Sequence, residues 1–452
     1  MKNVYMILLT LFISNGIIKA QIRWDSASLH VNKLFPYGIS AVNSNVAWTM
    51  TWGGNFTVSP WRFVDTAHHF SRTIDGGRTW SSGVYPFVDY GYTPKIFGVS
   101  ADIAWVAHSL NSGDGLLFKT KDGGNTWTMP YSRKVPIAWV HFWDSENGII
   151  LYNPDFAGFG IYKTNDGGVT WKRRTTLPAY LPGEGSYGGV YSAKGNVILF
   201  ATSRGRIFRS TDKGETWAVS ATLLPTSQEY NDISCDGRGN CIVSGGIYRD
   251  SLAFTGRFYT SSDNGTTWTA QPLHNFVCAS AQYIPGTSTI IAAGRNNNNP
   301  LKSKFRVILS HDNGASWQVI DTTVRIFSLS FIDKNTGFAT RYPNDNNETM
   351  AYRYLGSPLT GLWQGEILRG DLKLFPNPIL SNELQISLND FETGEYRLLV
   401  NSMNGELIES RNIEYQTPQN IVIPTSHWLS GMYFVTLTSA KGKITQKVIK
   451  TN

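Results

Sequence analysis

Six aspartates stand in copies of one eight-residue pattern, Ser/Thr-x-Asp-x-Gly-x-Ser/Thr-Trp, at steps of 47, 44, 46, 51 and 49 residues. Calcium loops also use Asp-x-Gly, but they need several oxygen ligands within about a dozen residues, and each copy here offers one carboxylate. A tight turn is the better interpretation, because the aspartate accepts hydrogen bonds from nearby backbone N–H groups and the glycine adopts positive φ. We therefore expect a structural role, without metal, for Asp75, Asp122, Asp166, Asp212, Asp263 and Asp312.

A second chemistry to consider is glycoside hydrolysis, which needs two carboxyl groups roughly 5–10 Å apart. Several acidic residues lie outside the repeated pattern, but they fall in different repeats and no sequence feature pairs them. They are Asp65, Asp89, Asp114, Asp155, Glu184, Asp250, Asp345 and Glu348. The chain also lacks a nucleophile motif, a Walker loop and zinc-ligand spacing. No catalytic residue is assigned, and the sequence favours a protein that is not an enzyme.

Histidines and cysteines offer little further chemistry. His68 and His69 are adjacent, and adjacent residues on a strand point to opposite faces, so a surface or capping role is expected unless both lie in a loop. We expect no cofactor. Cys235 and Cys241 flank a tight-turn sequence and could form a disulfide across a hairpin if the chain is exported. The sequence leaves both the disulfide and the two free thiols open. Cys278 lies in an apolar run and is expected to be buried.

Aromatic residues gather in four long segments between the repeated patterns, at 52–69, 85–92, 177–187 and 246–256. Aromatic side chains on loops over a rigid scaffold suit the recognition of sugar rings or protein surfaces. The predicted ligand-binding residues are Trp52, Trp61, Arg62, Tyr90, Tyr92, Tyr180, Tyr248 and Arg249. The alternative is that these rings pack the loops onto the scaffold.

The repeat itself predicts the architecture that must position these loops. A near-constant period of this length is typical of propellers and solenoids. Each repeat reads as four strands, with the conserved-looking turn between the third and the outermost strand and its tryptophan directed into a core. The innermost-strand pattern occurs seven times, and the segment at 21–29 (QIRWDSASL) resembles the outermost strand of a repeat. We predict an all-β, closed seven-bladed β-propeller over residues 21–365, with the N-terminal strand completing the last blade.

The repeated pattern resembles the Asp-box, or bacterial neuraminidase repeat, of sialidases, xyloglucanases, sortilin-type receptors and photosystem II assembly factors. Because these proteins do different things, the resemblance implies a fold and not a function. Sialidases also carry an Arg-Ile-Pro motif, which this chain lacks. The xyloglucanase class implies two propellers that face each other, and this chain has repeats for one. These departures count against both activities.

The C-terminal segment, 366–452, begins where the repeats stop. Short alternating apolar segments separated by turns predict a small Ig-like β-sandwich. The segment resembles the type A C-terminal sorting domain of the type IX secretion system of Bacteroidetes in Phe375-Pro376-Asn377-Pro378, in Gly431-Met432-Tyr433 and in a basic end at 447–450. The resemblance implies recognition by the outer-membrane translocon. The alternative is a carbohydrate- or protein-binding sandwich that stays attached.

The N-terminal residues 1–20 form a short basic start and an apolar run that predict a cleaved signal peptide, too short to span a membrane. No later stretch is apolar enough for a membrane span in the mature chain. The net charge of +7 is mild for 452 residues and lacks a long basic run, so no nucleic-acid partner is expected.

Together these features predict a secreted or cell-surface protein that the type IX system exports. Its propeller is expected to be a binding module for a glycan or a surface protein. The alternative is a glycoside hydrolase, with a sialidase-like or xyloglucanase-like fold, that acts on extracellular polysaccharide.

Overall fold

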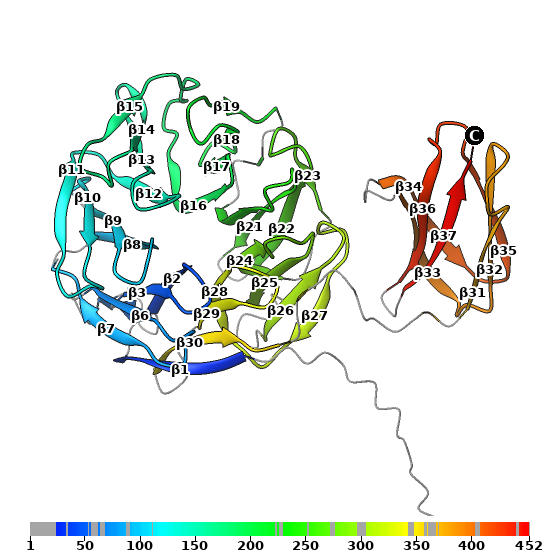
Figure 1. The fold of residues 1–452 in the computed structure, drawn as a ribbon, viewed down its shortest axis with the longest axis horizontal. Helices are drawn as coiled ribbons and strands as arrows, with labels where there is room; N and C mark the ends of the chain where they lie inside the picture. The colour runs from blue at the N-terminus through cyan, green and yellow to red at the C-terminus, as the bar shows by residue number, and fades with distance from the viewer. Residues whose placement is uncertain are drawn as a thin grey trace, which may run out of the picture. The chain divides into compact units, whose positions relative to one another are not determined.

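All regular structure in the described part of the chain is β-strand, and the computed structural model divides into two compact units, residues 1–361 and 362–452 (Figure 1). The described residues are 24–32, 35–52, 54–55, 62–63, 68–86, 91–110, 112–221, 224–225, 229–250, 253–271, 276–295, 304–341, 348–356, 359, 368, 370–402, 407–439 and 443–451. The predicted signal peptide, 1–20, lies outside them. Within these ranges no helix has the length and apolar character of a membrane span.

Seven antiparallel sheets of four strands each form the first unit, and this confirms the predicted seven-bladed propeller. The first three blades are β2 (Phe35–Ala41), β3 (Ala47–Trp52), β6 (His69–Thr73) and β7 (Ser81–Val84); β8 (Gly91–Gly98), β9 (Ala104–Leu110), β10 (Gly115–Thr120) and β11 (Thr128–Arg133); and β12 (Ile137–Phe142), β13 (Gly148–Asp155), β14 (Gly158–Thr164) and β15 (Lys172–Arg174). A two-stranded pair, β4 (Gly54–Asn55) and β5 (Arg62–Phe63), lies between β3 and β6.

The other four blades repeat this plan. They are β16 (Ser186–Lys194), β17 (Val197–Thr202), β18 (Ile207–Ser210) and β19 (Ala218–Val219); β20 (Glu229–Cys235), β21 (Cys241–Asp250), β22 (Ala253–Ser261) and β23 (Thr269–Ala270); β24 (Val277–Tyr283), β25 (Ile290–Arg295), β26 (Phe305–Ser310) and β27 (Gln318–Asp321); and β28 (Ile326–Phe331), β29 (Gly337–Arg341), β30 (Glu348–Tyr354) and β1 (Trp24–Asn32).

The ring is closed by the N-terminal strand, as the sequence predicted. β1 pairs antiparallel with β30, from Trp24 opposite Tyr354 to Asn32 opposite Glu348. Arg353 of β30 also donates to the Asp25 carboxylate from both Nε (2.8 Å) and Nη2 (2.5 Å). Because the two ends of the propeller share one sheet, that blade has no open edge at the closure.

Side chains of the innermost strands join neighbouring blades. In each case a backbone N–H of one blade donates to a side-chain oxygen of the blade before it, for example Gly98 N to Ser40 Oγ at 3.0 Å and Phe331 N to Gln282 Oε1 at 2.7 Å. The same kind of bond is accepted by Ser192, Ser234, Ser280, Ser330 and Asp232. Among the described residues these bonds, here called the polar belt, link the inner strands at five of the seven blade junctions.

The repeated turn has the same hydrogen-bond network in all six copies, and the second copy illustrates it. Asp122 accepts hydrogen bonds from the Thr120 hydroxyl (2.9 Å), the Thr126 N–H (2.8 Å) and the Thr126 hydroxyl (2.6 Å). The Thr120 hydroxyl in turn accepts from Gly124 N at 2.9 Å. The hydrogen bonds from Thr126 and Thr120 hold the pKa of Asp122 below its usual range. The aspartate therefore satisfies the hydrogen-bond donors of its own turn. The turn does not present a set of oxygens of the kind that binds a metal ion.

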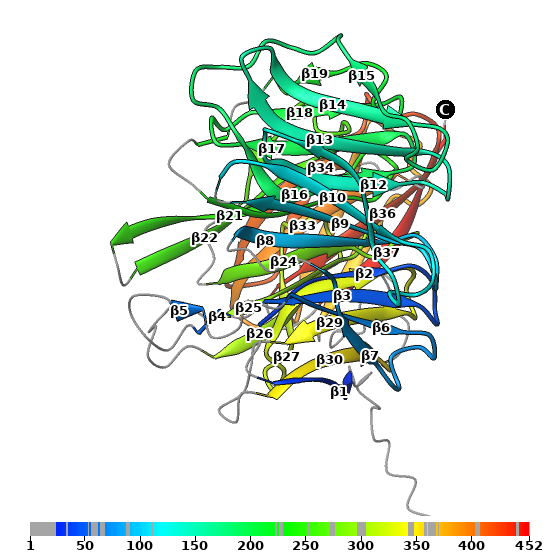
Figure 2. The same ribbon diagram turned by 90° about the vertical axis from the view of Figure 1, so that its left-hand side faces the viewer.

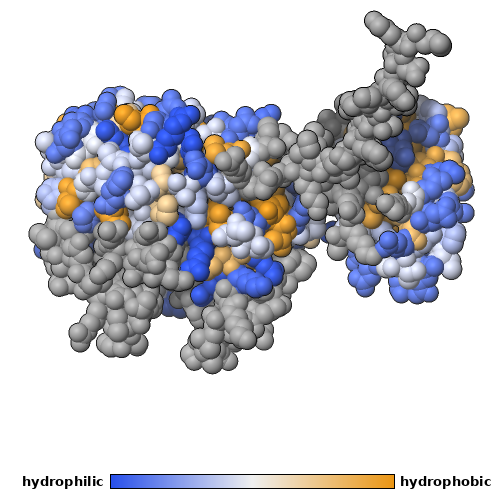
Figure 3. All heavy atoms as spheres, turned by 90° about the horizontal axis from the view of Figure 1, so that it is seen from below, coloured by the Kyte–Doolittle hydropathy of each residue, from blue (hydrophilic) through white to orange (hydrophobic). Residues whose placement is uncertain are grey.

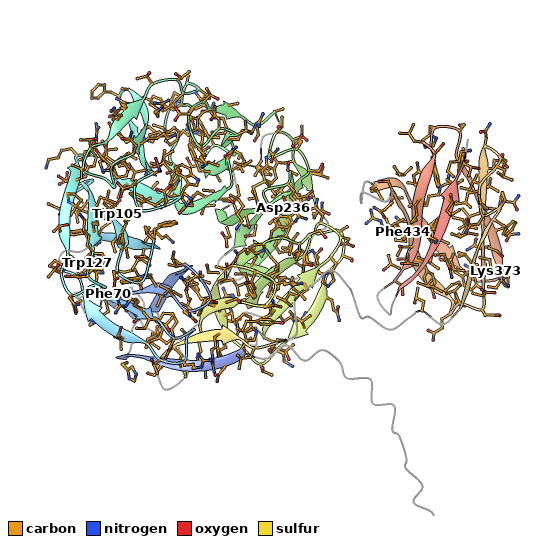
Figure 4. The ribbon with its side chains drawn as sticks, in the orientation of Figure 1. Phe70, Trp105, Trp127, Asp236, Lys373 and Phe434 are labelled. Atoms are coloured by element: carbon orange, nitrogen blue, oxygen red, sulfur yellow. A yellow bond between two sulfur atoms is a disulfide. The ribbon has the colours of Figure 1, made fainter. Side chains whose placement is uncertain are left out.

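The box glycine also fits each turn against the preceding blade. Gly124 has φ of +92°, and a Cβ there would lie 2.1 Å from Cζ of Phe70, which belongs to the blade before. A Cβ at Gly168, with φ of +82°, would lie 2.4 Å from Cη2 of Trp105. Phe70 also meets Trp127 edge-to-face at 5.4 Å (Figure 4). Glycine is therefore needed both for the left-handed backbone and for the close contact between blades.

Cationic side chains reinforce the same junctions. Lys119, on the third strand of the second blade, donates from Nζ to the Gly167 carbonyl of the next box at 2.6 Å and lies 4.6 Å from the Trp105 ring centroid. Arg72 likewise donates to the Ala101 carbonyl of the next blade at 2.7 Å. Burial lowers the pKa of Lys119. A third-strand cation thus reaches across to the following blade.

The second unit is a sandwich of two antiparallel sheets. One contains β31 (Asp371–Phe375), β32 (Glu383–Asn389) and β35 (Gln419–Pro424), and the other contains β34 (Leu407–Tyr415), β33 (Gly394–Ser402), β36 (Gly431–Thr438) and β37 (Lys443–Lys450). Alternate residues of both sheets enclose the core, among them Leu384, Ile386, Leu398, Val400, Val435 and Val448. This arrangement confirms the predicted Ig-like sandwich.

The box network yields a stability prediction. Thr120→Val keeps the side-chain shape but removes the hydroxyl that bonds Asp122 and Gly124, and Thr120 is 1% exposed. We expect it to lower the free energy of unfolding by about 1–3 kcal/mol, because a buried donor loses its partner. The exposed Thr126→Val is the matched control and should cost less, about 1 kcal/mol or below. Urea unfolding at neutral pH measures both, and equal costs for the two variants would contradict the prediction.

Candidate functional site

The propeller has two unlike faces. The boxes and the turns between first and second strands share one face, here called the box face, since Gly123 N donates to the Asp102 carbonyl in the turn before β9. The connections between blades and those between second and third strands lie on the other, here called the open face. Figure 2 shows the β21–β22 hairpin and the β4–β5 pair extending on the same side. The described ends of the four aromatic segments singled out from the sequence lie on the open face.

The backbone places several predicted ligand-binding residues at the open-face ends of their strands. Trp52 ends β3, Arg62 begins β5, and Tyr92 is the second residue of β8. Tyr248 and Arg249 lie near the end of β21. The side chains of these five residues, and all of Trp61 and Tyr90, lie outside the described residues, so their part in binding stays a prediction.

Tyr180 is the predicted site residue whose side chain is described. It is half-buried, packs against the core cluster around Trp139, and lies over Gly158, where a Cβ would be 3.4 Å from Cδ1 of Tyr180. Gly158 has φ of +94° and begins β14. The ring therefore fixes the connection at 175–185 onto the β13–β14 hairpin.

The tip of the β13–β14 hairpin exposes an aromatic ring that the sequence analysis did not single out. Phe156 is 97% exposed. Its neighbours hold the tip in place, because Asp155 accepts from Ala157 N at 2.8 Å and is paired with Arg133 (3.6 Å) and Arg173 (3.8 Å). We call Phe156, Tyr180 and the 42% exposed Leu181 the Phe156 surface.

Glu184, a candidate acid, has a buried carboxylate whose two oxygens both accept hydrogen bonds. Its side chain is 0% exposed and accepts from Arg206 through Nε (2.9 Å) and Nη2 (2.7 Å), from the Thr202 hydroxyl (2.6 Å) and from Leu181 N (2.8 Å). Burial alone would raise the pKa of Glu184, but the hydrogen bonds from Arg206 and Thr202 hold it below its usual range. Such a carboxylate stays ionised and paired, and it anchors the connection that carries Tyr180.

Two of the other candidate acids, Asp114 and Asp155, have described side chains, and each is paired with a cation. Asp155 is paired as above, and Asp114 accepts from Ser112 Oγ at 3.1 Å and meets Lys134 at 3.3 Å. Asp65, Asp89 and Asp345, and the side chains of Asp250 and Glu348, are not among the residues that the structure describes. In the described ranges no group of three or more His, Cys, Asp or Glu side chains could hold a metal ion.

His68 belongs to a buried polar cluster at the start of β6 rather than to a pair with His69. Its ring stacks on Tyr85 at 5.6 Å and meets the His108 ring edge-on at 4.9 Å. Tyr85 and His108 are joined by a hydrogen bond of 2.6 Å between Oη and Nδ1. Burial, and next to it the charge of His68, lowers the pKa of His108 to about 3, so His108 is neutral at physiological pH. The cluster secures both ends of the β6–β7 hairpin under the open face.

Asp232, on an inner strand, has a shifted pKa and was not among the acids selected from the sequence. Asp232 on β20 accepts from Ile233 N (2.9 Å), Ser280 Oγ (2.8 Å) and Ala281 N (3.1 Å), and so links two blades. Burial raises the pKa of Asp232 to about 6, although these hydrogen bonds and Lys95 oppose the shift. These partners assign Asp232 a structural role as a link between the two blades.

Cys235 and Cys241 face each other at the end of the β20–β21 hairpin and form a disulfide. The turn between them is closed by Asp236, which accepts from Arg238 N at 2.7 Å and Asn240 N at 3.1 Å. Cys278 is buried, and burial raises the pKa of its thiol well above the ordinary value. A neutral buried thiol is a packing group rather than a nucleophile.

Comparison with known proteins identifies the second unit. Residues 373–451 match the family described as secretion system C-terminal sorting domain. The C-terminal unit is a type IX sorting domain. The sorting domain indicates export by the type IX secretion system to the cell surface or the extracellular space, and interaction with the secretion machinery.

The propeller has weaker relatives. A xyloglucanase from Paenibacillus sp is 24% identical over 245 residues, and the match covers 44% of this chain and 23% of the xyloglucanase. Among solved structures, YCF48 from Cyanidioschyzon merolae is 16% identical with a TM-score of 0.49, covering 74% of this chain and 98% of YCF48. A GH74 xyloglucanase from Xanthomonas campestris is 13% identical with a TM-score of 0.46, covering 81% and 60%. These likenesses assign no site.

The Glu184–Arg206 pair gives a test of its structural role. Arg206→Met leaves a buried carboxylate without its cation, and we expect a loss of about 3–5 kcal/mol in the free energy of unfolding. The double variant Glu184→Leu with Arg206→Met removes both charges and should recover most of that loss. Urea unfolding of the wild type and the variants measures the difference, and a cost below about 1 kcal/mol for Arg206→Met would show that the pair is not a buried anchor.

Proposed function

We propose that this exported propeller is a binding module for an extracellular glycan or a surface protein, and that the open face holds the ligand. The observation that carries the proposal is Phe156. A phenyl ring that is 97% exposed at the tip of a tight hairpin gains nothing for folding, since it contacts almost no protein. Its burial against a ligand would contribute binding free energy instead.

The surroundings of Phe156 support binding because they are already ordered. Two arginines hold Asp155, and Tyr180 packs against Gly158, so little conformational entropy would be lost when a ligand binds. Arg204 donates from Nη2 to the Pro182 carbonyl at 2.7 Å, and Arg206 donates from Nη2 to the Ala179 carbonyl at 2.8 Å. An apolar centre with a cationic and carbonyl-rich rim suits both sugar rings and polar protein surfaces.

A second candidate is a glycoside hydrolase, which the local similarity to a xyloglucanase favours. The described candidate acids support it poorly, since Asp114, Asp155 and Glu184 each have their own partners. Release of reducing ends from xyloglucan by the purified protein would establish the hydrolase in place of the binding module.

Phe156→Ser tests the binding module. The purified propeller with its sorting domain is measured against a panel of neutral and acidic polysaccharides, starting with xyloglucan, and against intact cell surfaces. We expect the variant to weaken the binding found for the wild type by about tenfold or more, the cost of one central aromatic contact. Tm should not change, because the side chain is almost wholly exposed.

The matched control is Val169→Ser, a 78% exposed side chain in the third box, on the opposite face. It should leave both binding and Tm unchanged. Binding that survives Phe156→Ser at full strength, or falls equally in the control, would contradict a ligand site at the Phe156 surface.

A further inference from the structure

Two leucines of the sorting domain are exposed far more than its other described apolar side chains. Leu380 is 76% exposed and Leu429 is 81% exposed. Single exposed leucines are ordinary on protein surfaces. These two are notable because the topology brings them to the same end of the sandwich.

Strand register fixes that common end. Leu429 stands two residues before Gly431, which begins β36 and lies opposite Lys450 at the end of β37. Leu380 follows Ile379, which forms a parallel bridge with Lys450. Both leucines therefore flank the last residue of β37.

The outer face of the four-stranded sheet continues the apolar surface at this end. Residues of β36 alternate, with Tyr433 and Val435 in the core, so Met432 and Phe434 point outward. Phe434 lies opposite Asn401, which in turn lies opposite Leu407, and Met432 lies opposite Ile449. We call Leu380, Leu407, Leu429, Met432, Phe434 and Ile449 the apolar end.

The rest of the described sandwich surface is mostly polar. At the other end of the same sheet face the outward residues are Glu395, Arg397, Glu414 and Thr438. The outer face of the three-stranded sheet presents Lys373, Gln385, Ser387 and Asn420, with Val422 and Phe375 among them. Figure 4 shows Lys373 and Phe434 on opposite sides of the sandwich, and Figure 3 shows hydrophobic patches on the surface of this unit.

We propose that the apolar end is the surface by which the sorting domain docks on a protein of the secretion machinery. A protein of that machinery is the expected partner, because the match to the sorting-domain family indicates interaction with the secretion machinery. An apolar patch rimmed by polar groups is typical of a protein interface. Exposed Lys447 lies opposite Phe434, and Lys450 donates to the Ser381 carbonyl at 2.7 Å, so a partner with an apolar centre and acidic rim is complementary.

The position of the apolar end favours this role. β31 begins at Asp371, which lies opposite Asn389, and it runs toward Phe375 and Asn377. Asn377 bonds the β37 backbone at Lys447 and Ile449. The apolar end is thus the end of the sandwich farthest from where β31 begins. Because Leu380 and Leu429 are already exposed, a partner can contact them while the domain stays folded.

The test uses the full chain in a bacterium with a working type IX system. The double variant Leu380→Ser with Leu429→Ser should lower the fraction of protein that reaches the cell surface or medium by about tenfold, with retained protein inside the outer membrane. Because both side chains are mostly exposed, Tm of the purified variant should equal that of the wild type. Replacement of both leucines by methionine keeps the surface apolar and should preserve export.

The matched control is Val422→Ser, which changes a 43% exposed residue on the outer face of the other sheet and should not affect export. Normal export of the serine pair would overturn the proposal. It would also be overturned if the wild type formed dimers that the serine pair separated, because the occupant would then be a second copy of the chain. The binding assay on Phe156 is independent of both outcomes.

Discussion

The fit of each box glycine against the blade before it is the constraint on which the propeller depends. At Gly124, Gly168 and Gly265 a Cβ would lie 2.1, 2.4 and 2.2 Å from side chains of the preceding blade, so no larger residue fits without movement. The aspartate network closes the turn in the one shape that brings this glycine to its neighbour. A local hydrogen-bond motif therefore determines packing between remote parts of the sequence, because it sets the spacing between their sheets.

The glycine contacts and the third-strand cations lie on the box face, so these junctions do not depend on the loops of the open face. The polar belt and the pairing of β1 with β30 join the blades through residues of the strands themselves. Buried clusters lie where connections meet the blades, as His68, Tyr85 and His108 do at the ends of β6 and β7 and Glu184 with Arg206 does at the connection 175–185. A rigid scaffold with separately anchored loops is an arrangement that suits recognition.

The sequence predicted those features whose causes are local. The spacing of the boxes, the four strands of each repeat and the closing strand at residue 24 follow from turn chemistry and alternation, which act over a few residues. Phe156 escaped prediction because its exposure depends on the register that places Asp155 opposite Gly158. The pairing of Glu184 with Arg206, 22 residues away, and of Tyr85 with His108, 23 residues away, depends on how strands and connections meet in space. No spacing rule in the sequence indicates such contacts.

A double-mutant cycle between Gly124 and Phe70 tests the role of the boxes as joints between blades most directly. Gly124→Ala, Phe70→Leu and the double variant are unfolded in urea, with Gly265→Ala plus Phe70→Leu as a distant control pair. If the box glycine is required by contact with Phe70, the smaller leucine relieves the clash, and the double variant is more stable than the sum of single costs by about 1–2 kcal/mol. The control pair should be additive. Additivity within about 0.5 kcal/mol at Gly124 and Phe70 would contradict the account, because the glycine would then serve its own turn alone.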